Sequence, residues 1–414
     1  MREKTIKTKI PEGGLGWSCI DDKEIDAVTA LLKTPEKLFR YQNGELRQCD
    51  LLERELCEMT GAKHALFVAS GTSALAACLS AYEIGPGDEV IVPAYTYIAT
   101  AAAVIDVGAV PVITEIDNSM GLDPEEVEKN ITPYTKAIIV VNMQGVPARL
   151  GKLRAVAKNH NLIVIEDCCQ AIGAKYNGKF CGIESDAFAW STNFYKVITC
   201  GEGGVFFTNN PDAYQRGLYQ SDSGMTMWES SIESTKQVPA FSRAGVRGNE
   251  INAAILRVQL TKLDKILSHT RYLKELLISK LNAPKNYTLQ HVDDSKGDCG
   301  FSFTIIANNQ QLAQKMNAQL REEGLTLGSV YNAGFPDRHI YCNWDSIINK
   351  QGATPLGYPW KDPAYKGNVI YSKDMCPKTL NILKCALRLT INVNTTGQNI
   401  LEIADAINKV DGLL

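Results

Sequence analysis

The sequence lacks the features that mark several broad functional classes. Lys and Arg number 43 against 46 Asp and Glu, a formal net charge of −3, so no excess of positive charge draws the chain toward nucleic acid or an anionic membrane. No apolar run approaches the roughly 18 residues of a membrane span. The N-terminal MREKTIKTKIPEGG also lacks the apolar core of a signal peptide. We therefore expect a cytoplasmic protein that binds neither nucleic acid nor membrane.

Cysteine is present, but not in a pattern that binds metal or builds a disulfide scaffold. The chain has 12 cysteines, none in a CxxC pair, and is far longer than the small secreted domains that depend on disulfides. Several lie in apolar runs, such as Cys78 in ALAACLSAY, where a free thiol packs as a small hydrophobic group. The sequence thus predicts reduced cysteines and no metal site.

The length and the periodicity of the chain indicate an α/β protein. Its 414 residues, 45% hydrophobic and 21% charged, are typical of a soluble protein with a large core and a smaller second domain. Between residues 60 and 210, short β-branched runs alternate with helical periodicity, which is typical of a mainly parallel sheet covered by helices. Seven strands are predicted, at 65–68, 89–92, 110–113, 137–141, 162–165, 187–190 and 205–208, with helices at 72–82, 97–107, 124–130 and 150–159.

The rest of the chain predicts a long loop, long helices and a second domain. Residues 214–240 lose the periodicity and are predicted to be a loop, whereas 249–281 have the apolar spacing of one or two long helices. Predicted strands at 300–306 and 386–391 and helices at 310–323 and 398–410 indicate a small α+β domain. We expect an N-terminal segment at 1–36, a large α/β domain at 37–280 and a small C-terminal domain at 281–414.

The first segment with chemical potential is ASGTS at 69–73, which follows a predicted strand and opens a predicted helix. The free backbone N–H groups of such a turn, with the hydroxyls of Ser70, Thr72 and Ser73, are suited to cradle a phosphate. The alternative is an ordinary helix N-cap, because Ser and Thr begin many helices.

The second segment is VIEDCCQAIGA at 164–174, where an apolar strand ends in two acids. Ligands of open α/β sheets bind at the carboxyl ends of the strands, so Asp167 stands where a cofactor would lie. The alternative is again a helix cap. Glu166 and Asp167 after a buried strand nevertheless require partners, because an unpaired buried acid is costly.

The third segment is WSTNFYK at 190–196, followed by a turn that contains GEGG at 201–204. Most lysines are solvated surface residues. Lys196 lies instead between a predicted strand and a glycine-rich turn among aromatic and apolar residues, a setting suited to Schiff-base chemistry. The GEGG run is not a dinucleotide fingerprint, because it precedes a strand and does not open a helix.

The fourth segment, PAYTYIAT at 93–100, offers aromatic rings at a strand end. Such a ring either packs in the core or lies flat on a planar cofactor. Together the four segments suit a ligand with a phosphate, a planar face, a basic ring nitrogen and an aldehyde. Pyridoxal 5'-phosphate (PLP) has all four features.

The order SGTSAL, VPAYTYIAT, EDCCQAIGA, Ser191 five residues before Lys196, and GEGG also resembles the DegT/DnrJ/StrS aminotransferases of fold type I. The resemblance is specific from about residue 37 to 270 and looser beyond. It implies that Lys196 binds PLP as a Schiff base and moves the proton, and that Asp167 pairs with the pyridine nitrogen. It further implies that Gln170 reaches the ring 3-hydroxyl, that Tyr97 stacks on the ring, and that Gly71, Thr72 and Ser191 hold the phosphate.

One departure concerns the segment before the long helix, where many relatives carry Gly-x-Asn-x-Arg and use the Asn to bind phosphate in the neighbouring subunit. Here Gly245 takes the Asn position, and Arg243, Arg247 or Asn249 are candidates to replace it. The residues Leu38-Phe39-Arg40-Tyr41 and the run at 198–204 are similar to the branch of the family that aminates an 8-keto octulosonate sugar.

The resemblance implies a homodimeric enzyme that moves an amino group from L-glutamate or L-glutamine to a keto or aldehyde sugar. A PLP-dependent dehydratase of the same family is one alternative, although such relatives carry His where this chain has Lys196. A nicotinamide oxidoreductase would need a GxGxxG that opens a helix, which the sequence lacks. A cofactor-binding regulator without catalysis is a third alternative. The acceptor is expected to meet the 214–240 loop and the stretch from Tyr331 to Trp344, where no motif identifies it.

Overall fold

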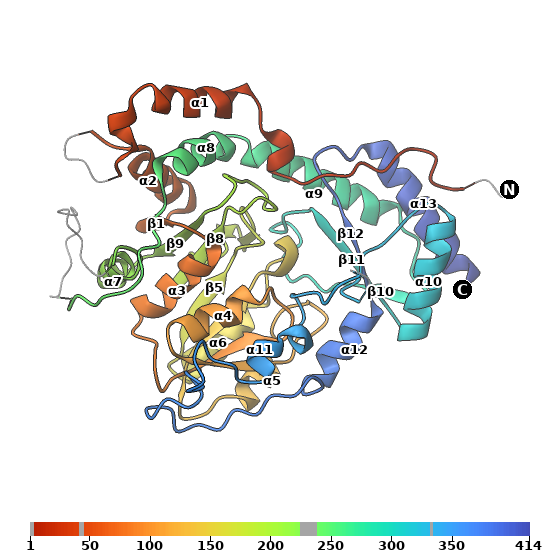
Figure 1. Ribbon diagram of the computed structural model, residues 1–414. Helices are drawn as coiled ribbons and strands as arrows, with labels where there is room; N and C mark the ends of the chain where they lie inside the picture. The colour runs from red at the N-terminus through yellow and green to blue at the C-terminus, as the bar shows by residue number, and fades with distance from the viewer. Residues whose placement is uncertain (1–3, 41–44, 224–237, 332–333) are drawn as a thin grey trace.

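A seven-stranded sheet forms the centre of the larger part of the molecule (Figure 1). The computed structural model describes residues 4–40, 45–223, 238–331 and 334–414. The strand order is β1-β9-β8-β5-β4-β2-β3. The strands are β1 (His64–Val68), β2 (Glu89–Pro93), β3 (Val110–Thr114), β4 (Thr135–Val141), β5 (Ile163–Asp167), β8 (Ala187–Ser191) and β9 (Gly204–Thr208).

The sheet is mainly parallel, which confirms the predicted α/β class and all seven predicted strands. Strands β3, β2, β4, β5 and β8 pair in parallel with their neighbours. Strand β9 is the exception, because it pairs antiparallel with both β1 and β8. The chain returns from β8 to β9 through the loop at residues 192–203, without a crossover helix, which is a connection that antiparallel neighbours allow.

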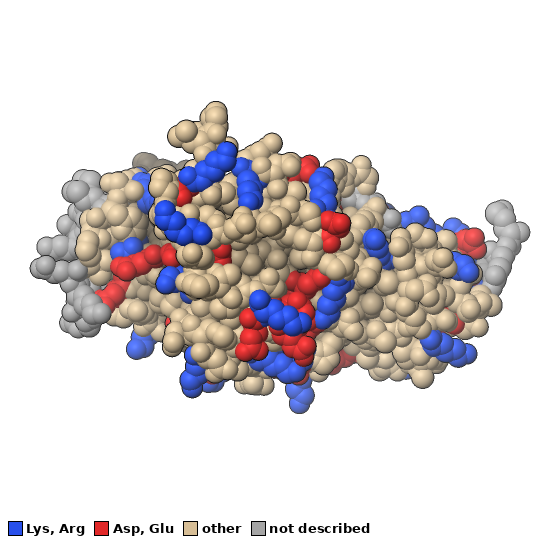
Figure 2. Space-filling model, turned by 90° about the horizontal axis from the view of Figure 1, so that it is seen from below, with Lys and Arg blue, Asp and Glu red and all other residues tan. Residues whose placement is uncertain are grey.

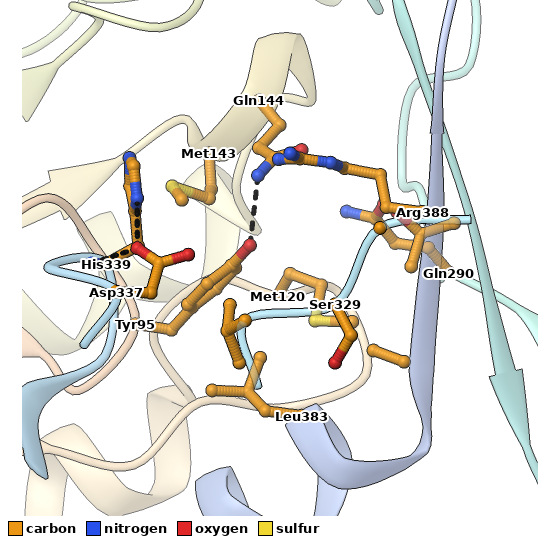
Figure 3. Close-up of a pocket in the computed structure, with 14 residues that line it drawn as sticks. Tyr95, Met120, Met143, Gln144, Gln290, Ser329, Asp337, His339, Leu383 and Arg388 are labelled. Carbon is orange, nitrogen blue, oxygen red and sulfur yellow. Dashed lines mark hydrogen bonds and ion pairs between the residues drawn. The ribbon is translucent and has the colours of Figure 1, made fainter. Parts of the chain in front are cut away.

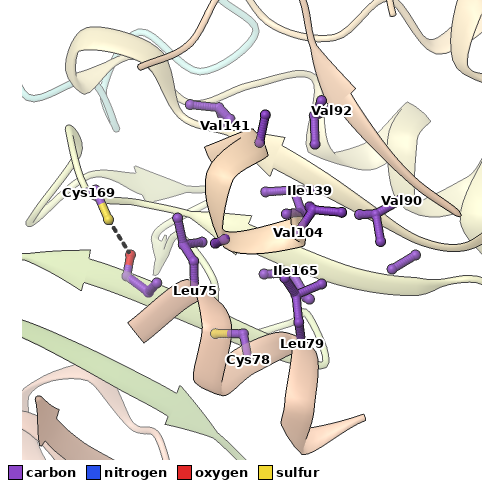
Figure 4. Close-up of a cluster of buried hydrophobic side chains, with 14 of the residues drawn as sticks. Leu75, Cys78, Leu79, Val90, Val92, Val104, Ile139, Val141, Ile165 and Cys169 are labelled. Atoms are coloured by element: carbon purple, nitrogen blue, oxygen red, sulfur yellow. Dashed lines mark hydrogen bonds between the residues drawn. The ribbon is translucent and has the colours of Figure 1, made fainter. Parts of the chain in front are cut away.

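Helices cover both faces of the sheet and bury alternate strand residues in two cores. One core lies under α3 (Gly71–Ala81), α4 (Ala99–Asp106) and α7 (Pro211–Ser221), and Figure 4 shows Leu75 and Leu79 of α3 packed toward Ile139 and Ile165 of the strands. The other core lies under α2 (Gln48–Thr60), α6 (Leu150–Asn159) and α8 (Glu250–Leu260). Successive strand residues therefore face different helices.

The predicted helices of this region are confirmed with small shifts at their ends, including α5 (Pro124–Lys129). The predicted loop at 214–240 is wrong for its first part, because residues 214–221 lie in α7. Asn210 caps this helix, and Gly217 has no side chain that would collide with Phe206, so the helix packs closely on β9 despite its polar composition. Residues 224–237 of the predicted loop lie outside the described residues.

The smaller part is an antiparallel three-stranded sheet with helices on it. Its strands are β10 (Tyr287–Leu289), β11 (Ser302–Ala307) and β12 (Ala386–Thr390), and its helices include α10 (Gln310–Glu322), α12 (Pro377–Cys385) and α13 (Gly397–Leu413). The two predicted strands and two predicted helices of this part are confirmed, whereas β10 and α12 were not predicted from the sequence.

One long helix connects the two parts. The segment 249–281 forms two helices, α8 and α9 (Leu263–Lys280). Leu263 and Leu267 of α9 pack in the core of the large sheet, whereas Leu273 and Leu277 pack in the core of the small one. Because α9 belongs to both cores, the domain boundary near residue 280 stays a prediction.

The N-terminal segment crosses both parts. Thr5 donates its backbone N–H to Glu323 at the end of α10, at 3.0 Å, and α1 (Asp22–Leu32) packs on α8. The remaining elements are η1 (Trp17–Cys19), η2 (Pro35–Leu38), η3 (Met143–Gly145), β6 (Lys175–Tyr176), β7 (Lys179–Phe180), η4 (Tyr341–Asn343) and α11 (Asp345–Ile348).

Three surface and side-chain properties bear on the sequence predictions. All 12 cysteines are free thiols in the structure. Acidic and basic side chains are interspersed on the face shown in Figure 2. Among the described residues, no helix is long and apolar enough to cross a membrane.

A buried ion pair ties β5 to α6. Glu166 is 0% exposed, and it accepts hydrogen bonds from Arg154 Nη2 at 2.8 Å, Ser185 Oγ at 2.5 Å and Asn142 Nδ2 at 3.1 Å. These contacts provide the partner that the sequence required for this acid. Removing the arginine would leave a buried carboxylate without its cation.

We predict that Arg154→Met lowers the free energy of unfolding by about 3 kcal/mol. The reason is that Glu166 would then be a buried carboxylate whose desolvation cost is no longer offset by a cation. Urea unfolding followed by circular dichroism measures the change. Arg54→Met, an exposed arginine on α2, is the control and is expected to change stability by less than about 0.5 kcal/mol. Equal stability of the two variants would contradict the assignment.

Candidate active site

The ends of β5 and β8, which carry the predicted site residues Asp167 and Ser191, lie at one edge of the sheet. These two side chains also lie on the same face. Strands β5 and β8 are parallel neighbours in which Asp167 pairs with Ala189, so Asp167 and Ser191 both stand at the carboxyl edge. Ile165 and Ala189 belong to the core under α3 and α4, whereas Val164 and Trp190 belong to the opposite core. Side chains alternate along a strand, so Asp167 and Ser191 face the α3 and α4 side.

Asp167 is a buried carboxylate held by neutral donors. It is 5% exposed, and its Oδ2 accepts a hydrogen bond from Thr100 Oγ1 at 2.8 Å while its Oδ1 accepts one from the backbone N–H of Cys169 at 3.0 Å. The Thr100 hydroxyl lies 2.8 Å from that of Thr96. Among the described residues, no Lys, Arg or His forms an ion pair with Asp167. A buried acid of this kind is set up for a cationic partner.

Gly71, Ser191 and Cys169 meet in a close-packed group beside this acid. A Cβ on Gly71 would lie 2.6 Å from Ser191 Cβ and 2.9 Å from Cys169 Sγ, so only glycine fits. Ser70 caps α3, since its Oγ accepts a hydrogen bond from the backbone N–H of Ser73 at 3.1 Å. The N-cap interpretation of this turn is therefore confirmed, and the N–H groups of the first turn still point out of the helix end.

Lys196 lies on the turn after β8 and is half-buried. Its backbone N–H donates to the Asn193 carbonyl at 3.0 Å, and its own carbonyl accepts from Gly16 N at 3.2 Å, so the N-terminal segment supports this turn. Burial, and next the charge of Asp167, raise the pKa of the Cys169 thiol well above its ordinary value, whereas the charge of Lys196 lowers it. The charges of Asp167 and Lys196 therefore act in opposite directions on the Cys169 thiol.

Tyr97 and Gln170 complete the set named from the sequence. Tyr97 is 42% exposed, and its ring lies 5.2 Å from the His339 ring between centroids, tilted by 52°. The backbone on either side is fixed, because Thr96 N donates to the His339 carbonyl and Ile98 N to the Arg338 carbonyl, both at 3.0 Å. Gln170 is half-buried on the turn that follows Asp167. Thr72 is half-buried in the first turn of α3.

The segment around Gly245, where the sequence departs from the family pattern, lies on the surface. Gly245 is exposed, and a Cβ there would meet only Ser223 Oγ at 3.1 Å. Arg243 donates to the carbonyls of Asp106 and Val107, at 3.4 and 3.3 Å, and Arg247 pairs with Asp222 at 3.0 Å. Asn249 caps α8. The proposal that one of these replaces the missing Asn stays a prediction.

Four residues at the site were given no individual role from the sequence. Thr100 and Cys169 hold or border the Asp167 carboxylate. A Cβ on Gly204 would lie 2.3 Å from the Ser70 carbonyl, so this glycine lets β9 approach the α3 turn. A Cβ on Gly16 would lie 2.8 Å from Ile198 Cα, so this glycine lets the N-terminal segment approach the loop after Lys196. Thr100 and Gly204 each end a motif that the sequence displays, whereas Gly16 acts through a contact that no local pattern shows.

Comparison with solved structures gives the same fold. The 3-amino-5-hydroxybenzoic acid (AHBA) synthase matches at 24% identity over 98% of this chain and 100% of its own, with a TM-score of 0.77. The Helicobacter pylori aminotransferase PseC matches at 22% identity over 98% and 100%, with a TM-score of 0.75. DesV from S. venezuelae, solved in complex with a ketimine intermediate, is 28% identical over 94% of both chains, with a TM-score of 0.74.

The fold is that of the fold type I PLP-dependent aminotransferases. The model of the DegT/DnrJ/EryC1/StrS aminotransferase family matches residues 18–351, and the chain belongs to this family. It is a PLP-dependent aminotransferase.

The described residues fit PLP. Asp167 offers a buried anion to a protonated ring nitrogen, Gly71 lets the first turn of α3 approach Ser191 closely, and the Tyr97 ring is partly exposed. Each of these properties is present in the protein itself, independent of any comparison.

We predict that Gly71→Ala weakens PLP binding at least tenfold, because the new methyl group must displace Ser191 and Cys169. Absorbance titration of the cofactor-free protein with PLP measures the affinity, and circular dichroism shows whether the variant is folded. Gly412→Ala is the control, since a Cβ there meets nothing within 4 Å. A folded Gly71→Ala protein with wild-type affinity would show that this glycine does not shape the cofactor site.

Proposed function

We propose that this aminotransferase moves an amino group from L-glutamate or L-glutamine to the carbonyl carbon of a keto or aldehyde sugar. The observation that carries the proposal is the buried Asp167 carboxylate, which accepts hydrogen bonds only from neutral donors among the described residues. It lies at the same sheet edge as Ser191, which packs against the Gly71 turn and precedes Lys196 by five residues. Sugar chemistry is supported by the names of similar structures. One is an aminotransferase involved in the biosynthesis of pseudoaminic acid, and another is a putative sugar aminotransferase from Streptococcus pneumoniae.

The residue roles follow the geometry and the family resemblance. Lys196 binds the cofactor covalently, and Asp167 faces the ring nitrogen from the end of β5. Tyr97 stacks on the ring, which its exposed face allows. Gly71, Thr72 and Ser191 bind the phosphate of the cofactor, and Gln170 contacts its ring 3-hydroxyl.

PLP in this position supplies electron withdrawal from the α-carbon of the amino donor. The Lys196 amine takes the proton from that α-carbon and in the second half delivers a proton to the acceptor carbon that receives the amine. Asp167 keeps a proton on the ring nitrogen. Thr100 and the Cys169 N–H orient the carboxylate for this task, and its burial excludes competing water.

We further propose that the enzyme is a homodimer whose interface covers the surroundings of Lys196. Tyr195, next to the lysine, is 79% exposed, and Phe194 stacks on Trp17 with both rings partly exposed. An exposed aromatic group of this kind is typical of a protein interface. The partner chain then completes the active site from this side.

The narrower acceptor class, an 8-keto octulosonate sugar, is proposed on the sequence resemblance at 38–41 and 198–204. Arg40 is buried and donates from Nη1 to the Phe67 carbonyl at 2.8 Å, so in this chain it braces β1. Tyr41 lies outside the described residues, as do residues 332 and 333 of the expected acceptor stretch.

The proposed function predicts amino transfer from L-glutamate to at least one keto sugar in a panel of free and nucleotide-linked sugars. Mass spectrometry detects the amino sugar, and coupled detection of 2-oxoglutarate measures the rate. Replacing L-glutamate by L-glutamine separates the two donors. A panel that includes an 8-keto octulosonate and yields no amino product with either donor would refute a sugar acceptor.

We predict that Asp167→Ala retains bound PLP but lowers turnover at least a hundredfold, because the ring nitrogen loses the anion that keeps it protonated. Absorbance measures the bound cofactor, and single-turnover mixing with L-glutamate measures proton transfer. Thr100→Val, which removes one donor to the carboxylate and keeps the shape of the side chain, is expected to show a smaller loss. Unchanged turnover in Asp167→Ala would remove this residue from the mechanism.

A further inference from the structure

The loop that carries Lys196 is held from inside the protein by a buried threonine. This loop, residues 192–203, connects β8 to β9. Its base is closed at the Thr192 carbonyl, which accepts hydrogen bonds from the Cys200 backbone N–H and from the Thr199 hydroxyl, both at 3.1 Å. Thr199 is 0% exposed, so it joins the loop to the protein interior.

Gln259 on α8 holds Thr199 in turn. Its side-chain Oε1 accepts the Thr199 backbone N–H at 3.4 Å, and its Nε2 donates to Glu24 Oε1 at 2.7 Å. Glu24 comes from α1, which lies over α8 (Figure 1). Because a carboxylate accepts hydrogen bonds and does not donate them, Glu24 orients the amide with its oxygen toward the loop. Gln259 is 0% exposed and therefore makes these bonds away from water.

Lys262 balances the buried charge of Glu24. Glu24 is 3% exposed, and Lys262 Nζ lies 2.7 and 2.8 Å from its two carboxylate oxygens. Lys262 also donates to the Cys19 carbonyl at 2.6 Å. Burial lowers the pKa of Lys262, but hydrogen bonds to Glu24 and Asp21 outweigh burial and raise the pKa above its ordinary value. The pair is ionised and hydrogen-bonded, so it fixes α1 on α8 at this point.

The N-terminal segment also contacts the loop directly, at Gly16. The Gly16 backbone N–H donates to the Lys196 carbonyl at 3.2 Å. A Cβ on Gly16 would lie 2.8 Å from Ile198 Cα and 2.9 Å from Thr199 N, so the two backbones touch. The lysine and the residues that follow it are therefore held twice, by the backbone before α1 and by the side chain of Gln259.

The supporting side chains are separate from the cavity of ≈ 200 Å³ that lies where the large and small sheets approach each other (Figure 3). Tyr95 and Gln144 line that cavity, and neither Glu24 nor Gln259 is among its lining residues. A substitution at Gln259 therefore acts on the reacting groups through the loop and not by contact with a molecule in that cavity.

We propose that Gln259 and Glu24 are positioning residues for Lys196, and that they act through Thr199 and the loop at 192–203. This inference rests on the proposed function, in which the Lys196 amine binds PLP and moves a proton. Such a transfer needs the amine at a fixed distance from the reacting carbon, and a misplacement of about 1 Å lowers the rate by up to roughly a hundredfold. If the buried group served only to attach α1, its loss would lower stability and leave proton transfer unchanged.

Gln259→Met tests the proposal, because it removes both hydrogen bonds of the amide and keeps the length of the side chain. In the PLP-loaded protein we expect the single-turnover rate with the amino donor to fall roughly tenfold, with the half-saturating donor concentration changed by less than about twofold. In the cofactor-free protein we expect amide hydrogen exchange to accelerate mainly in residues 192–203. Glu24→Gln keeps an oxygen that accepts from Gln259 Nε2, so we expect it to fall between Gln259→Met and the wild type.

Lys274→Met is the matched control. It breaks another buried ion pair, with Asp298, which is 3% exposed. Urea unfolding measures the loss of stability in each variant. We expect Lys274→Met to be destabilised while its single-turnover rate and the hydrogen exchange of the loop at 192–203 stay at the wild-type values.

A wild-type rate in Gln259→Met, or a loss of rate that Lys274→Met shares at equal stability, would overturn the proposal. A slower rate with wild-type exchange in the loop would overturn it as well, because Gln259 would then act by another route. Should Gln259→Met fail to fold, Glu24→Gln is judged by the same criteria. Borohydride labelling of the wild type is done first. Absence of cofactor on Lys196 refutes the proposed function, whereas the exchange data on the cofactor-free protein report separately on whether Gln259 holds the loop.

Discussion

The arrangement of the site depends on one interaction, the hydrogen-bonded burial of the Asp167 carboxylate at the end of β5. The strand pleat sends the adjacent acids to opposite faces of the sheet. Glu166 accepts a hydrogen bond from Arg154 on one face, whereas the Asp167 carboxylate, within the described part of the chain, accepts only from the hydroxyl of Thr100 and the N–H of Cys169 on the other. Two neighbouring acids thus have different surroundings, because Glu166 is paired with a cation inside the fold and Asp167 has no cationic partner among the described residues.

Close backbone approach builds the rest of the site around this acid. Gly204 lets β9 reach the Ser70 turn, and Gly71 lets that turn reach Ser191 and Cys169. Behind Lys196, the N-terminal segment approaches through Gly16. The antiparallel β9, which interrupts the parallel order of the sheet, is the element that brings the glycine-rich turn against the start of α3. The proposed cofactor site is therefore the product of tight packing at one sheet edge.

The sequence predicts the strands, and with them Asp167 and Ser191 at strand ends, because hydrophobic runs and turn residues are local signals. The turn at Gly71 and the lysine after β8 are visible for the same reason. The direction of β9, the helix at 211–221 and the role of Thr100 were not predictable, because each depends on contacts between distant segments. For the domain boundary, a single helix shared by two cores leaves no compositional break to detect.

The central claim is that PLP is attached to Lys196 and faces Asp167. Borohydride reduction of the PLP-loaded protein, followed by proteolysis and mass spectrometry, tests it most directly. The account predicts one modified peptide, with the reduced cofactor on Lys196. Cofactor fixed to a different lysine, or no modified peptide from a protein that binds PLP, would contradict it.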